Sequence, residues 1–181
     1  MADPNSIMKN AFEYAHKNRM FEIEMFWKRS LIFWGFISAA FIGLAALGDK
    51  SLAYSVLFTS FGFVCSVVWA LGNRGSKYWQ EYWEEKVKET QHEVTGDIFV
   101  DHKPVIYPWY AQFAARRKSV SKLVMGLSDY SVVVWLALLI YSNVTSLAEP
   151  NPVVKNVSLI IFSVCTVLYT IYLYIVCGSE D

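Results

Sequence analysis

The sequence SLIFWGFISAAFIGLAALGDKSLAYSVLFTSFGFVCSVVWALGN, residues 30–73, carries charge only at Asp49 and Lys50. On either side of this charged pair lies an apolar run of about 20 residues, the length that an α-helix needs to cross roughly 30 Å of hydrocarbon. The four residues 48–51 leave room only for a tight turn. We therefore predict two membrane spans, at about 30–48 and 52–72, joined as an antiparallel hairpin.

A second pair of apolar runs follows at about 124–147 and 153–177, separated by the short connection 148–152. The only charge between Lys122 and Glu149 is Asp129. Over all 181 residues, 55% are hydrophobic and 17% aromatic, which is unusual for a soluble domain. The sequence predicts an all-α integral membrane protein with four transmembrane helices, arranged as two antiparallel hairpins.

The basic residues are distributed unevenly around these spans. Of the 16 Lys and Arg residues, only Lys50 and Lys155 lie in or beside the two short connections. The others precede the first span or lie between the second and third spans, which by the positive-inside rule places both termini and the central loop in the cytoplasm. The predicted segments are a cytoplasmic N-terminal helix (1–29), a first transmembrane hairpin (30–72), a cytoplasmic loop domain (73–122), a second transmembrane hairpin (123–177) and a short tail (178–181).

The cytoplasmic segments have patterns of their own. Residues 4–29 show apolar side chains at helical spacing, which predicts an amphipathic helix that lies in the interface or packs on the central loop. Residues 73–95 predict a helix that continues the second span and ends near Gly96, with ion pairs from Lys77 to Glu81 and from Glu84 to Lys88. Beyond it, two apolar triplets predict a short β-hairpin: Ile98, Phe99 and Val100, then Val105, Ile106 and Tyr107.

Three strings resemble the RipA-like family of small bacterial cytoplasmic-membrane proteins. They are FWKR (26–29), NRGSKYWQEYWE (73–84) and SVSKL (119–123), spread over most of the chain. The resemblance implies a homo-oligomer, octameric in that family, in a bacterial inner membrane. It implies no enzymatic chemistry and brings no catalytic residues.

The string at 73–84 has two physical interpretations. Tyr78, Trp79 and Trp83 either form an aromatic belt at the membrane surface or contact a second subunit. The residues of the predicted β-hairpin are further candidates for such a contact between subunits. A ligand site is a weaker third possibility. Basic side chains near the same surface are candidates for contact with anionic lipid headgroups: Arg74, Lys77, Arg116, Arg117 and Lys118.

Small residues recur every four positions in the first two spans: Gly35, Ala39 and Gly43, then Gly62, Ser66 and Ala70. Such stripes let helix backbones approach closely inside a membrane. They serve packing within one subunit's own hairpin or packing between subunits, and the sequence leaves both open.

Two polar side chains inside the third span need partners. Asp129 either pairs with Lys122 or Arg74 near the headgroups, or lines a water-filled path or binds a cation; Asn143 is the second buried polar candidate. The same positions, with the hydroxyls of Ser55, Thr59, Ser66 and Thr170, are the lining that a channel at the centre of an oligomer would use.

These observations favour a non-enzymatic homo-oligomer that acts as an envelope scaffold. A channel is the first alternative, and an enzyme acting on lipid headgroups through Asp97, Asp101 and His102 is the second. We expect no catalytic residue, metal or cofactor and no nucleic-acid partner. The expected partners are the lipid bilayer and other copies of the chain.

Overall fold

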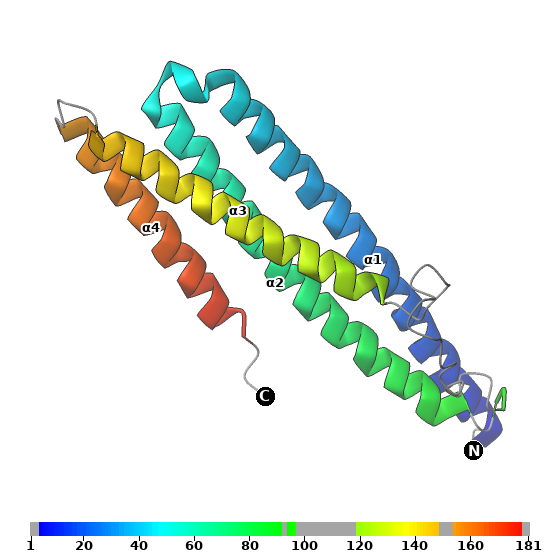
Figure 1. Cartoon of the computed structure of the whole chain (residues 1–181). Coiled ribbons are helices and arrows are strands. Elements are labelled where there is room, and N and C mark those ends of the chain that lie inside the picture. The colour runs from blue at the N-terminus through cyan, green and yellow to red at the C-terminus, as the bar shows by residue number, and fades with distance from the viewer. Residues whose placement is uncertain (1–3, 92–93, 97–118, 149–153, 179–181) are drawn as a thin grey trace, which may run out of the picture. The chain divides into compact units, whose positions relative to one another are not determined.

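The computed structural model describes residues 4–91, 94–96, 119–148 and 154–178. It contains four α-helices, shown in Figure 1: α1 (Pro4–Leu47), α2 (Leu52–Gln91), α3 (Val120–Ala148) and α4 (Val154–Val176). A short 3-10 helix, Gly48–Lys50, links α1 to α2. The predicted all-helical architecture is confirmed, since helices are the only regular elements among the described residues. The predicted β-hairpin lies outside them.

Each of the four helices contains an apolar stretch long enough to cross a bilayer. The prediction of four candidate membrane helices is therefore confirmed. Two of the helices are much longer than a bilayer requires: α1 has 44 residues and α2 has 40, about 60 Å or more at 1.5 Å per residue. The predicted N-terminal helix is thus the first part of α1, and the predicted continuation of the second span is the last part of α2.

The end of α2 is followed by a turn close to the predicted stop. The backbone amides of Val94 and Thr95 both donate to the carbonyl of Gln91, at 3.0 and 2.9 Å. Gly96 then adopts a φ of 69°, a left-handed conformation that side chains with a Cβ disfavour. The glycine predicted to end the helix accordingly completes the turn.

The chain divides into two compact units. One consists of Met1–Phe26 and Ser76–Lys122, and the other of Trp27–Gly75 and Leu123–Asp181. We call them the two-helix unit and the four-helix unit, because the first is built on the N-terminal part of α1 and the C-terminal part of α2, and the second contains parts of all four helices. The four-helix unit holds the candidate membrane spans.

The core of the four-helix unit is centred on Trp135 of α3, which is fully buried. Ala40 of α1, Phe63 of α2 and Leu139 of α3 complete the buried cluster. Its position explains why Gly62 is required, because a Cβ at that position would overlap the Trp135 indole.

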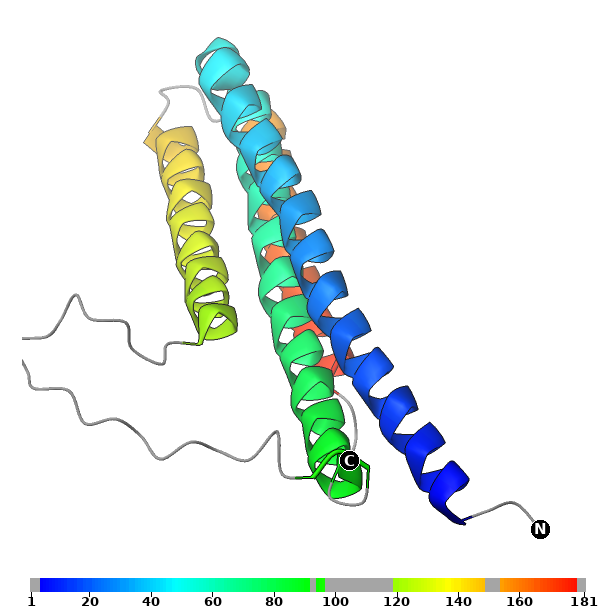
Figure 2. The same cartoon turned by 90° about the vertical axis from the view of Figure 1, so that its right-hand side faces the viewer.

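In this unit α1 and α2 lie side by side in both views (Figures 1 and 2). Near one end, the Ser30 hydroxyl accepts from the Trp69 indole at 3.2 Å and donates to the Asn73 side-chain oxygen at 3.4 Å. Near the other end, Gly43 lies against the ring of Phe58. The contacts therefore extend along most of the first predicted span.

Polar contacts also join α2 to α3. The Ser55 and Ser142 hydroxyls are 2.8 Å apart, and the Ser66 and Ser131 hydroxyls are also 2.8 Å apart. Residue numbers fall along α3 as they rise along α2, so these two helices run antiparallel. Hydroxyl pairs of this kind join helices in a membrane, where no water competes for them.

Candidate self-assembly surfaces and a charged groove

The C-terminal part of α2 carries four aromatic side chains in contact, which we call the aromatic ladder: Tyr78, Trp79, Tyr82 and Trp83. Successive ring centroids are 5.5, 5.6 and 5.1 Å apart, and each pair meets edge to face. Tyr78 and Trp79 are 58% and 48% exposed. Edge-to-face pairs stabilise one another, so the ladder is an ordered apolar surface rather than a set of independent side chains.

The opposite side of the same helix segment is buried. Val87 is 2% exposed and Gln80 is 7% exposed, and the N-terminal part of α1 contributes the buried Ala15 and Phe26 to the same unit. This face of α2 is therefore used inside the subunit. Tyr78, Trp79 and Tyr82 of the ladder lie on the side that remains open.

Trp83 differs from the two other predicted contact residues. Its ring meets that of Tyr14 on α1, with centroids 5.9 Å apart and planes at 78°. Trp83 is half-buried, so part of its surface is already used within the subunit. Tyr78 and Trp79 are the more available pair, and Tyr82 is an exposed ladder member that the sequence prediction omitted.

Ion pairs flank the ladder. Both predicted pairs form, Lys77 with Glu81 at 3.2 Å and Lys88 with Glu84 at 3.5 Å. A third joins Lys86 to Glu89 at 2.8 Å, and this hydrogen bond, with the nearby negative charge, raises the pKa of Lys86. The pairs give α2 a charged surface around an apolar strip.

The two stripes of small residues have different surroundings. In the second span, Gly62 lies against Trp135, while Ser66 and Ala70 are buried. This stripe packs inside the subunit, against α3.

In the first span, only Gly43 has such a neighbour, Phe58. Among the residues that the structure describes, none has an atom within 4 Å of a Cβ placed at Gly35, and Ala39 is exposed. The buried residues Ser30 and Ala40 bracket the opposite side of α1. The Gly35–Ala39 stripe therefore faces outward from the subunit.

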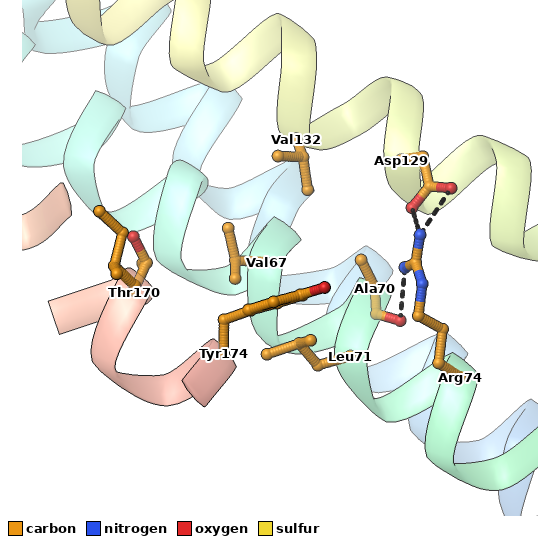
Figure 3. A pocket seen from close by; sticks show the side chains of 9 residues that line it. Val67, Ala70, Leu71, Arg74, Asp129, Val132, Thr170 and Tyr174 are labelled. Carbon is orange, nitrogen blue, oxygen red and sulfur yellow. Dashed lines mark hydrogen bonds and ion pairs between the residues drawn. The ribbon is translucent and has the colours of Figure 1, made fainter. Parts of the chain in front are cut away.

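Asp129 is paired with Arg74, one of the two partners that the sequence suggested. The Arg74 Nη2 lies 2.9 Å from Asp129 Oδ1 and donates to Oδ2 at 3.0 Å, while Nη1 donates to the Ala70 carbonyl at 3.1 Å (Figure 3). The two side chains are 48% and 49% exposed. The pair lies at the edge of an open groove of about 380 Å³ lined by residues of α2, α3 and α4, which we call the charged groove.

The other polar candidates in the spans have partners within the four-helix unit. Asn143 donates to the carbonyl of Leu139 at 2.7 Å and to the Ser163 hydroxyl at 3.0 Å. Thr59 donates to the carbonyl of Ser55, and Thr170 to that of Val167, both at 2.8 Å.

Sequence reasoning missed the contact of Ser30 with Trp69 and Asn73, and the central place of Trp135. Tryptophans in a membrane protein favour the interface, which is why those at 69 and 135 carried no signal for the core. The contact between Ser30 and Asn73 had one signal in the sequence. The two residues are polar and stand at the two ends of the first predicted transmembrane hairpin.

Several predicted residues lie outside the described part of the chain. They are the hairpin residues Ile98, Phe99, Val100, Val105, Ile106 and Tyr107, the basic residues Arg116, Arg117 and Lys118, and the polar cluster Asp97, Asp101 and His102. Their predicted roles stay predictions.

The sequence model of the octameric membrane protein family (8xMP) matches residues 9–145, about three quarters of the chain. A search of curated proteins and a search of solved structures each found no match. The match extends from α1 through nearly all of α3, and so includes the aromatic ladder, both small-residue stripes and the Arg74–Asp129 pair. It does not test the resemblance to RipA-like proteins, which stays a prediction. By this match and by its four apolar helices, the chain belongs to the octameric membrane protein family.

Proposed function

We propose that this chain is a non-enzymatic, four-pass protein of a bacterial inner membrane, and that its copies assemble into a closed ring of eight that serves as an envelope scaffold. The four spans form two antiparallel hairpins with both termini in the cytoplasm. The distribution of 14 of the 16 basic residues supports that orientation. The family to which the chain belongs supports self-assembly.

The observation that carries the proposal is the exposed aromatic ladder beyond the apolar part of α2. Residues 51–73 are uncharged, and charges begin at Arg74. Along the helix, Tyr82 lies about 13 Å past Asn73, whereas the headgroup layer is only about 5–8 Å thick on each side. An aromatic surface there faces water unless a protein covers it, and exposed aromatic clusters are characteristic of protein interfaces.

The outward stripe on α1 provides a second contact within the membrane. Gly35 and Ala39 leave the helix backbone accessible on the side away from the subunit's own core. Small residues at this spacing let a neighbouring helix approach closely, so that van der Waals contact drives association without a hydrophobic effect. The stripe is therefore a candidate contact between neighbouring subunits within the membrane.

The hydrogen bonds in the four-helix unit favour a scaffold over a channel. Ser55 and Ser66 pair with hydroxyls of α3, and Asn143 pairs with Ser163. These groups hold the helices of one subunit together. Ser66 is also fully buried, so a pore lined by it would require that side chain to turn towards the centre of the ring and give up its partners.

The test is the mass of the full-length protein in lipid nanodiscs, measured by native mass spectrometry. The wild-type protein should give one species of eight times the 20.7-kDa chain. The double variant Tyr78→Ala/Trp79→Ala removes the most exposed part of the ladder and should shift the protein to smaller species. Phe21→Ala, which removes a 53%-exposed ring from α1 outside the ladder, should leave the mass unchanged.

A wild-type particle of 20.7 kDa would overturn the proposal. If the wild-type protein is octameric and the double variant is too, the ladder is an aromatic belt and the subunits associate elsewhere. Circular dichroism of each variant separates loss of assembly from loss of helix. Ion flux through proteoliposomes above that of empty vesicles would favour the channel alternative.

A further inference from the structure

The charged groove combines an apolar wall with a pair of opposite charges at one edge. Val67 and Leu71 of α2, Val132 of α3 and Ile171 of α4 form much of the wall. Arg74 and Asp129 stand at the edge, as Figure 3 shows. Its volume of about 380 Å³ is within the usual range for small-molecule sites. A site that is apolar along its length and charged at its end matches an amphiphile.

The position of the charges along the helix points to a phospholipid. Arg74 is the first charged residue after the uncharged run 51–73, so its guanidinium lies at the level of the headgroups while the wall formed by Val67 and Leu71 lies at the level of the acyl chains. Tyr174 reaches from α4 towards Ala70 on α2 (Figure 3). Its hydroxyl supplies a further hydrogen-bonding group near this edge.

The charge of the pair indicates which phospholipid. Arg74 and Asp129 lie within 3.0 Å of each other, so an anionic headgroup would be attracted by one and repelled by the other. A zwitterionic headgroup satisfies both. Each side chain is about half exposed, which leaves part of the guanidinium and part of the carboxylate open to a ligand.

We propose that the charged groove binds phosphatidylethanolamine, with its phosphate on Arg74, its ammonium group on Asp129 and part of one acyl chain along the apolar wall. The guanidinium donates to phosphate oxygens in the fork geometry that favours them, and the primary ammonium donates to the carboxylate. Phosphatidylcholine has no ammonium hydrogen to donate, and phosphatidylglycerol has no cation. The site does not depend on the number of subunits, so it stands apart from the proposed ring.

The test is lipid retention by the full-length protein in nanodiscs made from equal parts of phosphatidylethanolamine, phosphatidylcholine and phosphatidylglycerol with identical acyl chains. After release into the gas phase, native mass spectrometry counts the lipids that remain bound. Wild-type protein should retain phosphatidylethanolamine in preference to both others, at up to one molecule per chain.

Asp129→Asn is the informative variant, because it removes the ammonium partner and leaves a single positive charge. The ratio of retained phosphatidylethanolamine to phosphatidylglycerol should fall by about threefold to tenfold. The ratio is measured on folded particles only, so partial loss of protein does not imitate the effect. Val132→Trp fills the groove and should reduce retention of all three lipids.

Lys88→Gln is the matched control. Lys88 lies about 21 Å beyond Arg74 along α2 and pairs with Glu84, outside the charged groove. Its loss should leave the lipid ratio unchanged. Equal retention of the three lipids by the wild-type protein would overturn the proposal, and so would an Asp129→Asn variant with the wild-type ratio. No retained lipid at all would also overturn it, and would indicate a neighbouring subunit in the groove.

Discussion

The indole of Trp135 occupies the space that a side chain at Gly62 would need. The nearest atoms to a Cβ at this glycine all belong to the fused rings of Trp135, which is 0% exposed. Trp135 also contacts Phe41 of α1, with ring centroids 4.3 Å apart and ring planes tilted by 40°. One glycine on α2 thereby lets a single side chain of α3 join three helices, and the packing of the four-helix unit depends on it.

Gly62→Ala should destabilise the protein by about 1–3 kcal/mol, the usual cost of adding a carbon atom to a filled core. The measurement is thermal unfolding of the purified protein in detergent, followed by tryptophan fluorescence. Gly72→Ala on the same helix is the control, because a Cβ there meets no atom of the described part of the chain within 4 Å. That variant should be as stable as the wild type or slightly more so, since alanine favours a helix. Equal melting temperatures for the two variants would contradict the proposed packing.

The hydroxyl pair of Ser66 and Ser131 should be coupled. Ser66 donates its single hydrogen to the carbonyl of Gly62 at 2.8 Å, so Ser131 is the donor within the pair. A double-mutant cycle with both serines changed to alanine should give a coupling energy of about 0.6 kcal/mol, the average for such bonds between membrane helices. The cycle is measured by unfolding in detergent. Additive effects of the two substitutions would show that the bond contributes nothing to stability.

Gly35→Leu should weaken subunit association while the subunit stays folded. Leucine at this outward position holds the neighbouring backbone away, and no atom of the subunit's described residues lies within 4 Å of the added Cβ. We expect a smaller share of full-size particles by native mass spectrometry and an unchanged helix content. Ala45→Leu, also exposed and about 80° around α1, is the control. If the two variants assemble equally well, the outward stripe is not a subunit contact.

Glu89→Gln should lower the pKa of Lys86 towards its ordinary value of 10.5, because the hydrogen bond and the charge of Glu89 raise it. A raised pKa in the folded state means that the pair stabilises the protein fully below about pH 10.5 and that this contribution is lost as the pH rises further. Nitrogen-15 NMR of the labelled lysine side chains measures the shift directly. An identical titration midpoint in the variant would exclude the pair in solution.

The existence of four long apolar helices, and the break between the first two, followed from local sequence. Runs of about 20 uncharged residues on either side of Asp49 and Lys50 predict membrane helices because the hydrocarbon thickness sets the length that is needed. The ion pairs of Lys77 and Lys88 also followed, since residues four apart on a helix are neighbours whatever surrounds them. Family membership also rests on the sequence alone, through the match over residues 9–145.

Contacts between helices required the tertiary structure. Gly35 and Gly62 have the same sequence signature, yet one faces outward and the other lies beneath Trp135. The sequence offered Lys122 and Arg74 as partners of Asp129. The packing of α3 on α2 brings Arg74 into contact with it. A periodic pattern specifies which residues share a face of a helix. The neighbour of that face depends on the rotation of each helix about its axis, which is determined by side chains far away in the sequence.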